Sequence, residues 1–270
     1  MAEPTLMKVP DALFRRHARS LFGGSDPKKI ALLTRLLRGD YGYSESEFTG
    51  ALVAADWGTT VTAGGGPTPF AFSAVRGGVI QGATGATDND ATAIQRAQTF
   101  LDPADNPVMI IRWRANAVTG FSFEIGFSDP KTDEALPGVT DVDTPSVGNG
   151  VTDILCVHMD TDQTLTTVAL VGDGTTGSPT ATSIFTTPTG ATGFTPTANT
   201  WQTYILGVRA NEGFAFLWDG RNLMANIQWR VSNGPDSGVL VRPYALFRTR
   251  NTVSKTIDIA FFDFAWERDF

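Results

Sequence analysis

The stretch "WQTYILGVRANEGFAFLWDGRNLMANIQWRV", residues 201–231, alternates apolar and polar side chains with a period of two. Successive side chains of a β-strand point to opposite faces of a sheet, so this period is typical of strands. The apolar positions form three runs, separated first by "NEG" and then by Asp219-Gly220, a dipeptide that accepts the positive φ angles of a tight hairpin turn. The stretch therefore predicts a three-stranded antiparallel meander with one solvated face.

The rest of the chain favours the same fold class. Of its 270 residues 41% are hydrophobic, and 28 glycines and 15 prolines supply turns between strands. Strand-like runs also occur at 107–115 and 120–128, which are expected to pair through the loop "NAVTG", and at 151–160 and 164–172, joined by "TDQ". The Thr-, Gly- and Pro-rich segment 172–200 is expected to be a long loop that crosses between sheets or decorates a rim. We therefore predict two packed antiparallel sheets, with an up-and-down barrel as the alternative.

Residues 1–40 differ from the remainder in both period and charge. "PDALFRRHARSLFGG" and "SDPKKIALLTRLLRGD" have the apolar spacing and end signals of two short helices. Eight basic and four acidic residues give this region a net charge of +4, whereas the other 230 residues, with 13 basic and 24 acidic, carry −11. We therefore divide the chain into a basic helical anchoring arm, residues 1–45, and a β-sandwich, residues 46–270. The alternative is that the arm packs against its own sandwich. The residues expected to anchor the arm to a partner surface are Arg15, Arg16, Arg19, Lys28, Lys29, Leu33 and Leu37.

Few residues could carry catalysis. Cys156 is the single cysteine, so no internal disulfide can form, and we expect a small buried hydrophobe at this position. The chain has two histidines, His17 and His158, and no zinc-ligand spacing or phosphate-binding glycine loop. Because His158 alternates with Cys156 along one strand, we expect it to be a partly buried structural residue.

Three pairs of aspartates are each separated by one residue: "DND" at 88–90, "DVD" at 141–143 and "DTD" at 160–162. Such residues can shape polar turns, bind a hard cation through their oxygens, or act together in glycoside hydrolysis. We expect polar turns and no resident metal, and calcium is the one cofactor that these pairs leave open.

The bulk properties exclude several partners. No apolar run approaches the roughly 18 residues of a membrane span, and the N-terminus lacks the apolar core of a secretory signal. The charge of −11 on the body disfavours nucleic-acid binding. We expect a protein made in a cytoplasm that has no membrane span and no nucleic-acid partner.

The run "WQTYILGVRANEGFAFLWDGRNL" resembles the concanavalin A-like and laminin-G-like jelly-roll family. In that family a Trp opens a strand, a hairpin follows, and the next strand ends in Asp-Gly; here these are Trp201, the strand 214–218 and Asp219-Gly220. The closing "YALFRTRNTVSKTIDIAFFDFAWERDF" is similar to the final strand pair of such domains. The resemblance implies an all-β fold, a two-sheet antiparallel jelly-roll sandwich with a short helical N-terminal arm.

The same family includes laminarinase-type hydrolases, which carry a Glu-x-Asp-x-Glu or Glu-x-Asp-x-x-Glu signature on one strand. Neither signature occurs in this chain. Glu124 in "SFEIGFSD" is the nearest acid on a suitable strand, and Gly126 stands where its partner would be. We therefore expect no enzymatic activity.

Jelly rolls preceded by a helical arm also resemble head-decoration proteins, head fibres and tail adhesins of tailed bacteriophages. This resemblance implies a non-enzymatic virion structural protein, of the capsid-decoration or fibre type, assembled in the host cytoplasm. Its arm would attach it to a capsid or tail protein of the same particle, and we expect a homo-oligomer. The alternative is a lectin-like carbohydrate-binding module that recognises a host or environmental glycan.

Overall fold

The computed structural model describes residues 41–44, 52, 56–62, 66–73, 79–97, 100–163, 167–175, 177–183, 194–209, 211–218 and 229–267. The predicted helices of the arm and all of its anchoring residues lie outside the described residues. No helix in the described part of the chain is long and apolar enough to cross a membrane.

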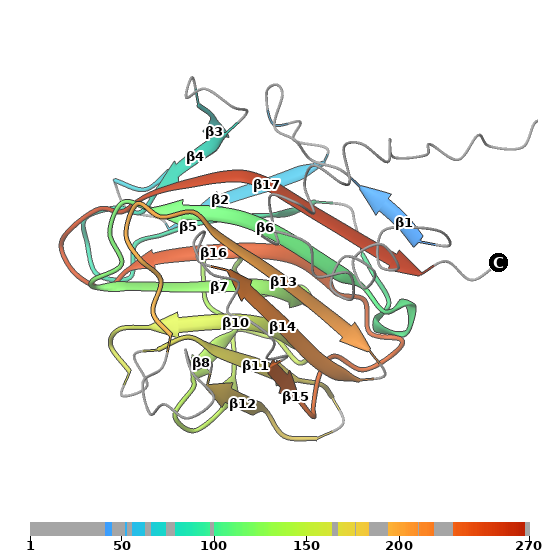
Figure 1. The fold of residues 1–270 in the computed structure, drawn as a ribbon. Helices are drawn as coiled ribbons and strands as arrows, with labels where there is room; N and C mark the ends of the chain where they lie inside the picture. The colour runs from blue at the N-terminus through green and yellow to red at the C-terminus, as the bar shows by residue number, and fades with distance from the viewer. Residues whose placement is uncertain are drawn as a thin grey trace, which may run out of the picture.

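Two antiparallel sheets pack face to face (Figure 1). The strands of sheet A are β1 (Tyr41–Ser44), β3 (Thr68–Phe72), β4 (Ile80–Ala83), β6 (Val108–Ala115), β13 (Gln202–Arg209), β14 (Glu212–Trp218), β15 (Trp229–Val231) and β17 (Thr256–Glu267). The strands of sheet B are β2 (Trp57–Val61), β5 (Ala91–Arg96), β7 (Phe121–Ser128), β10 (Ile154–Asp160), β11 (Ala169–Asp173), β12 (Thr180–Ser183) and β16 (Arg242–Thr249). A small separate sheet contains β8 (Val139–Asp141) and β9 (Ser146–Val147), and a 3-10 helix spans Pro103–Asp105.

The order of the strands in each sheet defines the topology of the sandwich. Sheet A runs β15-β14-β13-β6-β17-β4-β3, with β1 paired to β17, and sheet B runs β12-β11-β10-β7-β16-β5-β2. The predicted all-β, two-sheet antiparallel sandwich is therefore confirmed for the described residues.

The predicted meander is present as β13, β14 and β15, and its Asp219-Gly220 turn and residues 221–228 lie outside the described residues. Arg209 pairs with Glu212 across a tight turn in which Asn211 has a φ of 65°, a left-handed conformation that Asn tolerates better than most residues. The expected solvated face is wrong for β13, where every residue except Arg209 is buried. This strand lies inside sheet A, between β6 and β14, so neighbouring strands flank both of its edges.

The predicted hairpin between 107–115 and 120–128 is wrong. These runs form β6 and β7, but β6 belongs to sheet A and β7 to sheet B, so the loop between them turns a corner of the sandwich. Their apolar faces meet across the core, with the ring centroid of Trp113 5.0 Å from that of Phe123. By contrast, β10 and β11 do pair as expected, and the chain after β12 crosses from sheet B to sheet A, as the segment 172–200 predicts.

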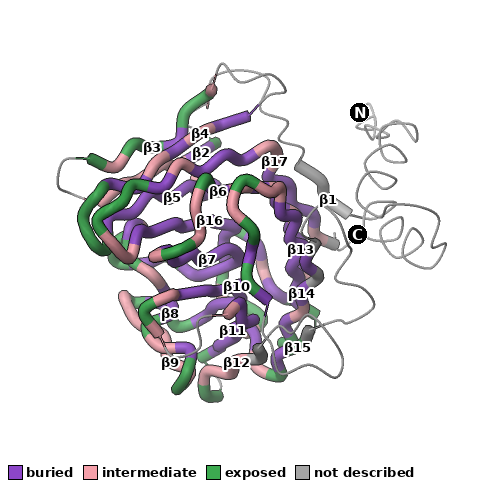
Figure 2. The backbone as a smooth tube through the Cα atoms, turned by 60° about the vertical axis from the view of Figure 1, so that its left-hand side comes forward, coloured by how far each residue is buried: buried purple, intermediate pink, exposed green. Residues whose placement is uncertain are grey.

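The main core fills the space between the sheets and is rich in aromatic side chains. Trp113, which is fully buried, lies at its centre and contacts the rings of Phe121, Tyr204 and Phe247. A second, smaller apolar cluster lies on the other face of sheet B, beneath residues 129–153, which include β8 and β9 and are called the cover segment below. Sheet B is therefore buried on both faces along β7, β10 and β16 (Figure 2).

Candidate functional site

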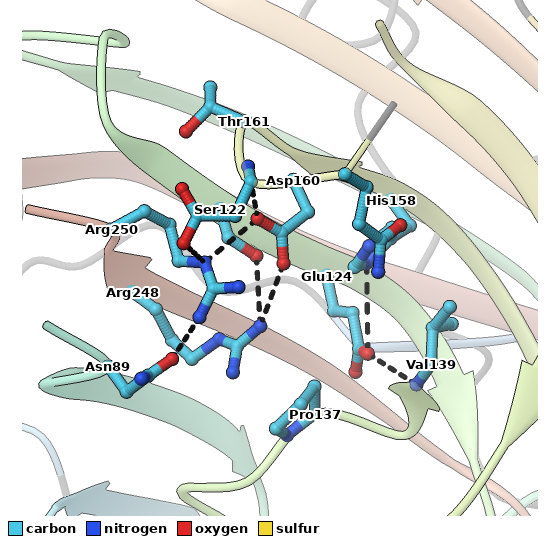
Figure 3. Close-up of polar contacts among 12 residues, drawn as sticks. Asn89, Ser122, Glu124, Pro137, Val139, His158, Asp160, Thr161, Arg248 and Arg250 are labelled. Carbon is cyan, nitrogen blue, oxygen red and sulfur yellow. Dashed lines mark hydrogen bonds and ion pairs between the residues drawn. The ribbon is translucent and has the colours of Figure 1, made fainter. Parts of the chain in front are cut away.

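The face of sheet B that is turned away from the main core carries a group of polar side chains (Figure 3). Adjacent strands bring them together in register. Asp160 of β10 pairs with Ser122 of β7, which in turn pairs with Arg248 of β16, and His158 pairs with Glu124 one step further along the strands. All five residues lie on one face because they are spaced by two along each strand.

Glu124 connects this face to the cover segment. Its carboxylate accepts hydrogen bonds from the backbone N–H groups of Gly138 (2.9 Å) and Val139 (2.7 Å). It also accepts from the Tyr244 hydroxyl at 2.8 Å and from the Lys131 ammonium at 3.2 Å. Only 1% of Glu124 is exposed, so its hydrogen-bonding capacity is used inside the protein.

The charge state of Glu124 follows from these contacts. Burial alone raises its pKa, but the charges of Lys131 and His158 and the hydrogen bonds from Val139 and Gly138 outweigh burial and lower the pKa to about 2. The carboxyl group is therefore ionised at neutral pH. A general acid in glycoside hydrolysis needs a raised pKa, so Glu124 is poorly suited to that role.

The structure also explains why Gly126 stands where laminarinase-type hydrolases have a second acid. A Cβ atom at position 126 would lie 2.0 Å from the carbonyl oxygen of Leu155 and 2.6 Å from the Cα of Cys156. Backbone atoms cannot yield at such distances, so no side chain fits there. Cys156 is fully buried, as predicted, and burial together with the charge of Glu124 raises the pKa of its thiol.

His158 and Arg248 have hydrogen-bonding atoms that the protein does not use. His158 is fully buried, not partly buried as expected, and neither ring nitrogen has a hydrogen-bond partner; Nδ1 lies 3.9 Å from Glu124 Oε2. Burial lowers the pKa of His158, which favours the neutral ring. Nη2 of Arg248 donates to Asp160 (3.2 Å) and Ser122 (3.3 Å), but its buried Nε has no partner. Such unused buried groups are rare and need an explanation.

The same face reaches solvent at a rim formed around Arg250. The Nε of Arg250 lies 2.9 Å from Asp160 Oδ1 and 3.1 Å from Asp162 Oδ2, and its Nη1 contacts Asn89 and lies 4.0 Å from Asp88. The Asp88 and Asp162 side chains are 54% and 42% exposed. The rim therefore presents both carboxylate oxygens and guanidinium donors to solvent.

The two predicted aspartate pairs at 88–90 and 160–162 thus come together, but through arginines that the sequence analysis missed. Arg248 and Arg250 occupy alternate positions at the end of β16, in "FRTR", and this period-two pattern could have marked them as neighbours on one face. The third pair is a polar turn, as predicted, because Asp141 Oδ1 accepts hydrogen bonds from the backbone of Asp143 and Thr144.

A different group of acids gathers at the far end of β10 and β11. Burial raises the pKa of Asp173 to about 6, and the charges of Asp153, Asp236 and Asp129 act in the same direction, against a hydrogen bond from the backbone of Gly174. Within the described ranges, no group of three or more His, Cys, Asp or Glu side chains has an arrangement that could hold a metal ion. Calcium binding remains a prediction.

No protein-family model matches this sequence, and no curated protein sequence matches it either. Similar folds occur among solved structures. Peanut lectin has a TM-score of 0.54 at 8% identity over 84% of this chain and 97% of its own. The VIP36 exoplasmic/lumenal domain in its Ca²⁺/Man3GlcNAc-bound form scores 0.50 at 9% identity (81% and 86%), and LamAcat from Zobellia galactanivorans scores 0.52 at 9% identity (82% and 96%). At such identities the likeness is one of fold: the sandwich is a concanavalin A-like jelly roll.

Proposed function

We propose that this protein is a non-catalytic carbohydrate-binding protein whose saccharide site lies at the rim around Arg250. The observation that carries the proposal is the rim itself, where the Arg250 guanidinium lies 3.1 Å from the carboxylate of Asp162 and 4.0 Å from that of Asp88, and both carboxylates are exposed. Sugar hydroxyl groups both donate and accept hydrogen bonds, so they can pair with carboxylate oxygens and guanidinium N–H groups at once.

The fold supports this assignment. Peanut lectin and the Man3GlcNAc-bound VIP36 domain have the same jelly-roll architecture, although fold alone does not establish a function. None of the similar solved structures named above supports the virion structural role that the sequence suggested. The anchoring residues of the arm, on which that role depended, lie outside the described residues.

The carboxylates on this face support the non-catalytic part of the proposal. Glu124 is ionised and fully hydrogen-bonded, and Gly126 leaves no room for a second acid. Asp160 is paired through both oxygens, with Arg248 and Arg250. A glycosidase needs one acid that is protonated at working pH and one carboxylate free to attack or to activate water. The described site has neither, so binding without turnover is the better match.

A glycan array probed with the purified full chain tests the proposal, and calorimetry on each glycan that binds gives its affinity. We expect Arg250→Gln to weaken binding about tenfold or more, because it removes charge-assisted hydrogen bonds at the rim. Arg209→Gln is the matched control, since Arg209 is exposed at the end of β13 in the other sheet. A parallel measurement in EDTA tests the calcium prediction.

Two results would contradict the proposal. One is an array without any bound glycan, and the other is a bound glycan whose affinity is unchanged in Arg250→Gln. Release of reducing ends from a bound polysaccharide would contradict the non-catalytic part of the proposal alone.

A further inference from the structure

The outer face of sheet A carries a second group of side chains, far from the rim around Arg250 because it lies on the opposite sheet. Arg112 and Arg114 of β6 flank Trp113, which points into the core, so both arginines lie on the outer face. Their guanidinium carbons lie 5.4 Å and 4.6 Å from the ring centroid of Trp201, just before β13. These distances are those of cation–π contacts, which hold both guanidinium groups beside one partly exposed indole.

The two arginines differ in their charge balance. Arg114 pairs with Asp258, its neighbour in register on β17: Nε and Nη2 each lie 2.8 Å from Asp258 Oδ2. The other oxygen of Asp258 accepts a hydrogen bond from Gln81 at 2.8 Å. The charge of Arg114 is therefore compensated within the protein.

Arg112 has no such compensation. In the part of the chain that the structure describes, no carboxylate forms an ion pair with it, and its buried Nε has no hydrogen-bond partner. Burial lowers the pKa of Arg112, with no opposing contribution from an acid. A partly buried guanidinium without a counter-charge is costly, and an anion that binds it regains that free energy.

We propose that Arg112, held in place by Trp201 beside Arg114, binds the carboxylate or sulfate group of an acidic saccharide. A guanidinium can bind two oxygens of a carboxylate or a sulfate group through two parallel hydrogen bonds, and contact with the indole fixes its orientation before the ligand arrives. The anion site rests on Arg112 and Trp201 alone; the choice of a saccharide as the carrier rests on the proposed function.

Binding measurements on the full chain with matched probes test this inference. The probes are an oligogalacturonate, a sulfated galactan oligosaccharide and its unsulfated parent, with free acetate and sulfate as competitors. We expect both acidic probes to bind about tenfold or more tightly than the neutral parent. We also expect their affinity to fall between 50 mM and 500 mM NaCl, because a partly exposed ion pair is screened by salt.

Variants assign the effect to Arg112. Arg112→Gln should abolish the preference for acidic probes, whereas Arg112→Lys, which keeps the charge but lacks the planar fork, should retain part of it. Arg209→Gln removes the same charge at an exposed position of the same sheet and should change nothing. Thermal melts of each variant report on folding, and if Arg112→Gln does not fold, the comparison of Arg112→Lys with wild type decides.

Several outcomes would overturn the inference. These are equal affinity for acidic and neutral probes, an unchanged preference in Arg112→Gln, an equal loss in Arg209→Gln, or tighter binding of poly-glutamate than of either acidic saccharide. Failure of the proposed function looks different: Arg250→Gln would leave neutral glycan binding unchanged, or no neutral glycan would bind, while the dependence of anion binding on Arg112 persisted.

Discussion

Replacing Glu124 by Gln should cost the protein about 3 kcal/mol of unfolding free energy at pH 7. The pKa of Glu124 falls from an ordinary 4.5 to about 2, and a tenfold change in an acid dissociation constant corresponds to about 1.4 kcal/mol of differential interaction between the ionised and neutral forms. The side chain of Lys131 is fully buried, so loss of its partner leaves a buried charge uncompensated. Breaking a buried ion pair from one side typically costs about 3–5 kcal/mol, in agreement with the first figure.

Urea unfolding followed by tryptophan fluorescence between pH 3 and pH 8 measures this loss. The pKa of Glu124 is lower in the folded than in the unfolded protein, so its contribution is fully present above about pH 4.5 and decreases as the pH falls toward 2. The stability difference between wild type and Glu124→Gln should therefore be constant near neutral pH and should shrink below about pH 4.5.

Two further variants make the prediction specific. Glu124→Gln combined with Lys131→Met removes both partners of the buried pair and should recover much of the lost stability. Asp133→Asn removes an exposed charge from the same cover segment and should change stability by less than about 0.5 kcal/mol. A loss below about 1 kcal/mol in Glu124→Gln would refute the reasoning, as would an unchanged melt accompanied by the disappearance of a hydrolytic activity.

Three other changes have definite expected outcomes. The pKa of Asp173 is raised to about 6, so the contribution of its neutral form to stability is lost as the pH rises through 6. Asp173→Asn should therefore melt at a higher temperature than wild type at pH 7.5. An equal or lower melting temperature would contradict this. Gly126→Ala should sharply lower the melting temperature, because the new methyl group collides with the backbone of Cys156, and a near-wild-type melt would show that β7 and β10 can separate there. Deletion of residues 1–40 should leave a cooperative β-sheet melt if the arm is a separate anchor, and aggregation of the truncated chain would show instead that the arm belongs to the core of the sandwich.

Local pattern in the sequence was sufficient to identify the strands of the meander and the burial of Cys156. The β13–β14 hairpin needs only alternating side chains and an Asn that adopts a positive φ at position 211, and both are properties of neighbouring residues. The all-β class could be predicted for the same reason. Apolar residues recur with a period of two from about residue 45 onward, without a helical period, and a chain of strands alone can bury its apolar faces only by packing one sheet against another.

The relation between β6 and β7 could not be decided in this way. A strand that enters a hairpin and a strand that turns a corner into the opposite sheet have the same alternation, and only the packing of Trp113 against Phe123 across the core distinguishes the two. The candidate site could not be predicted from local pattern either, because Asp160, Arg248 and Arg250 meet only where β10, β7 and β16 are adjacent in sheet B. That adjacency depends on the free energy of burying strands far apart in the chain against one another, a quantity that no local stretch of sequence contains.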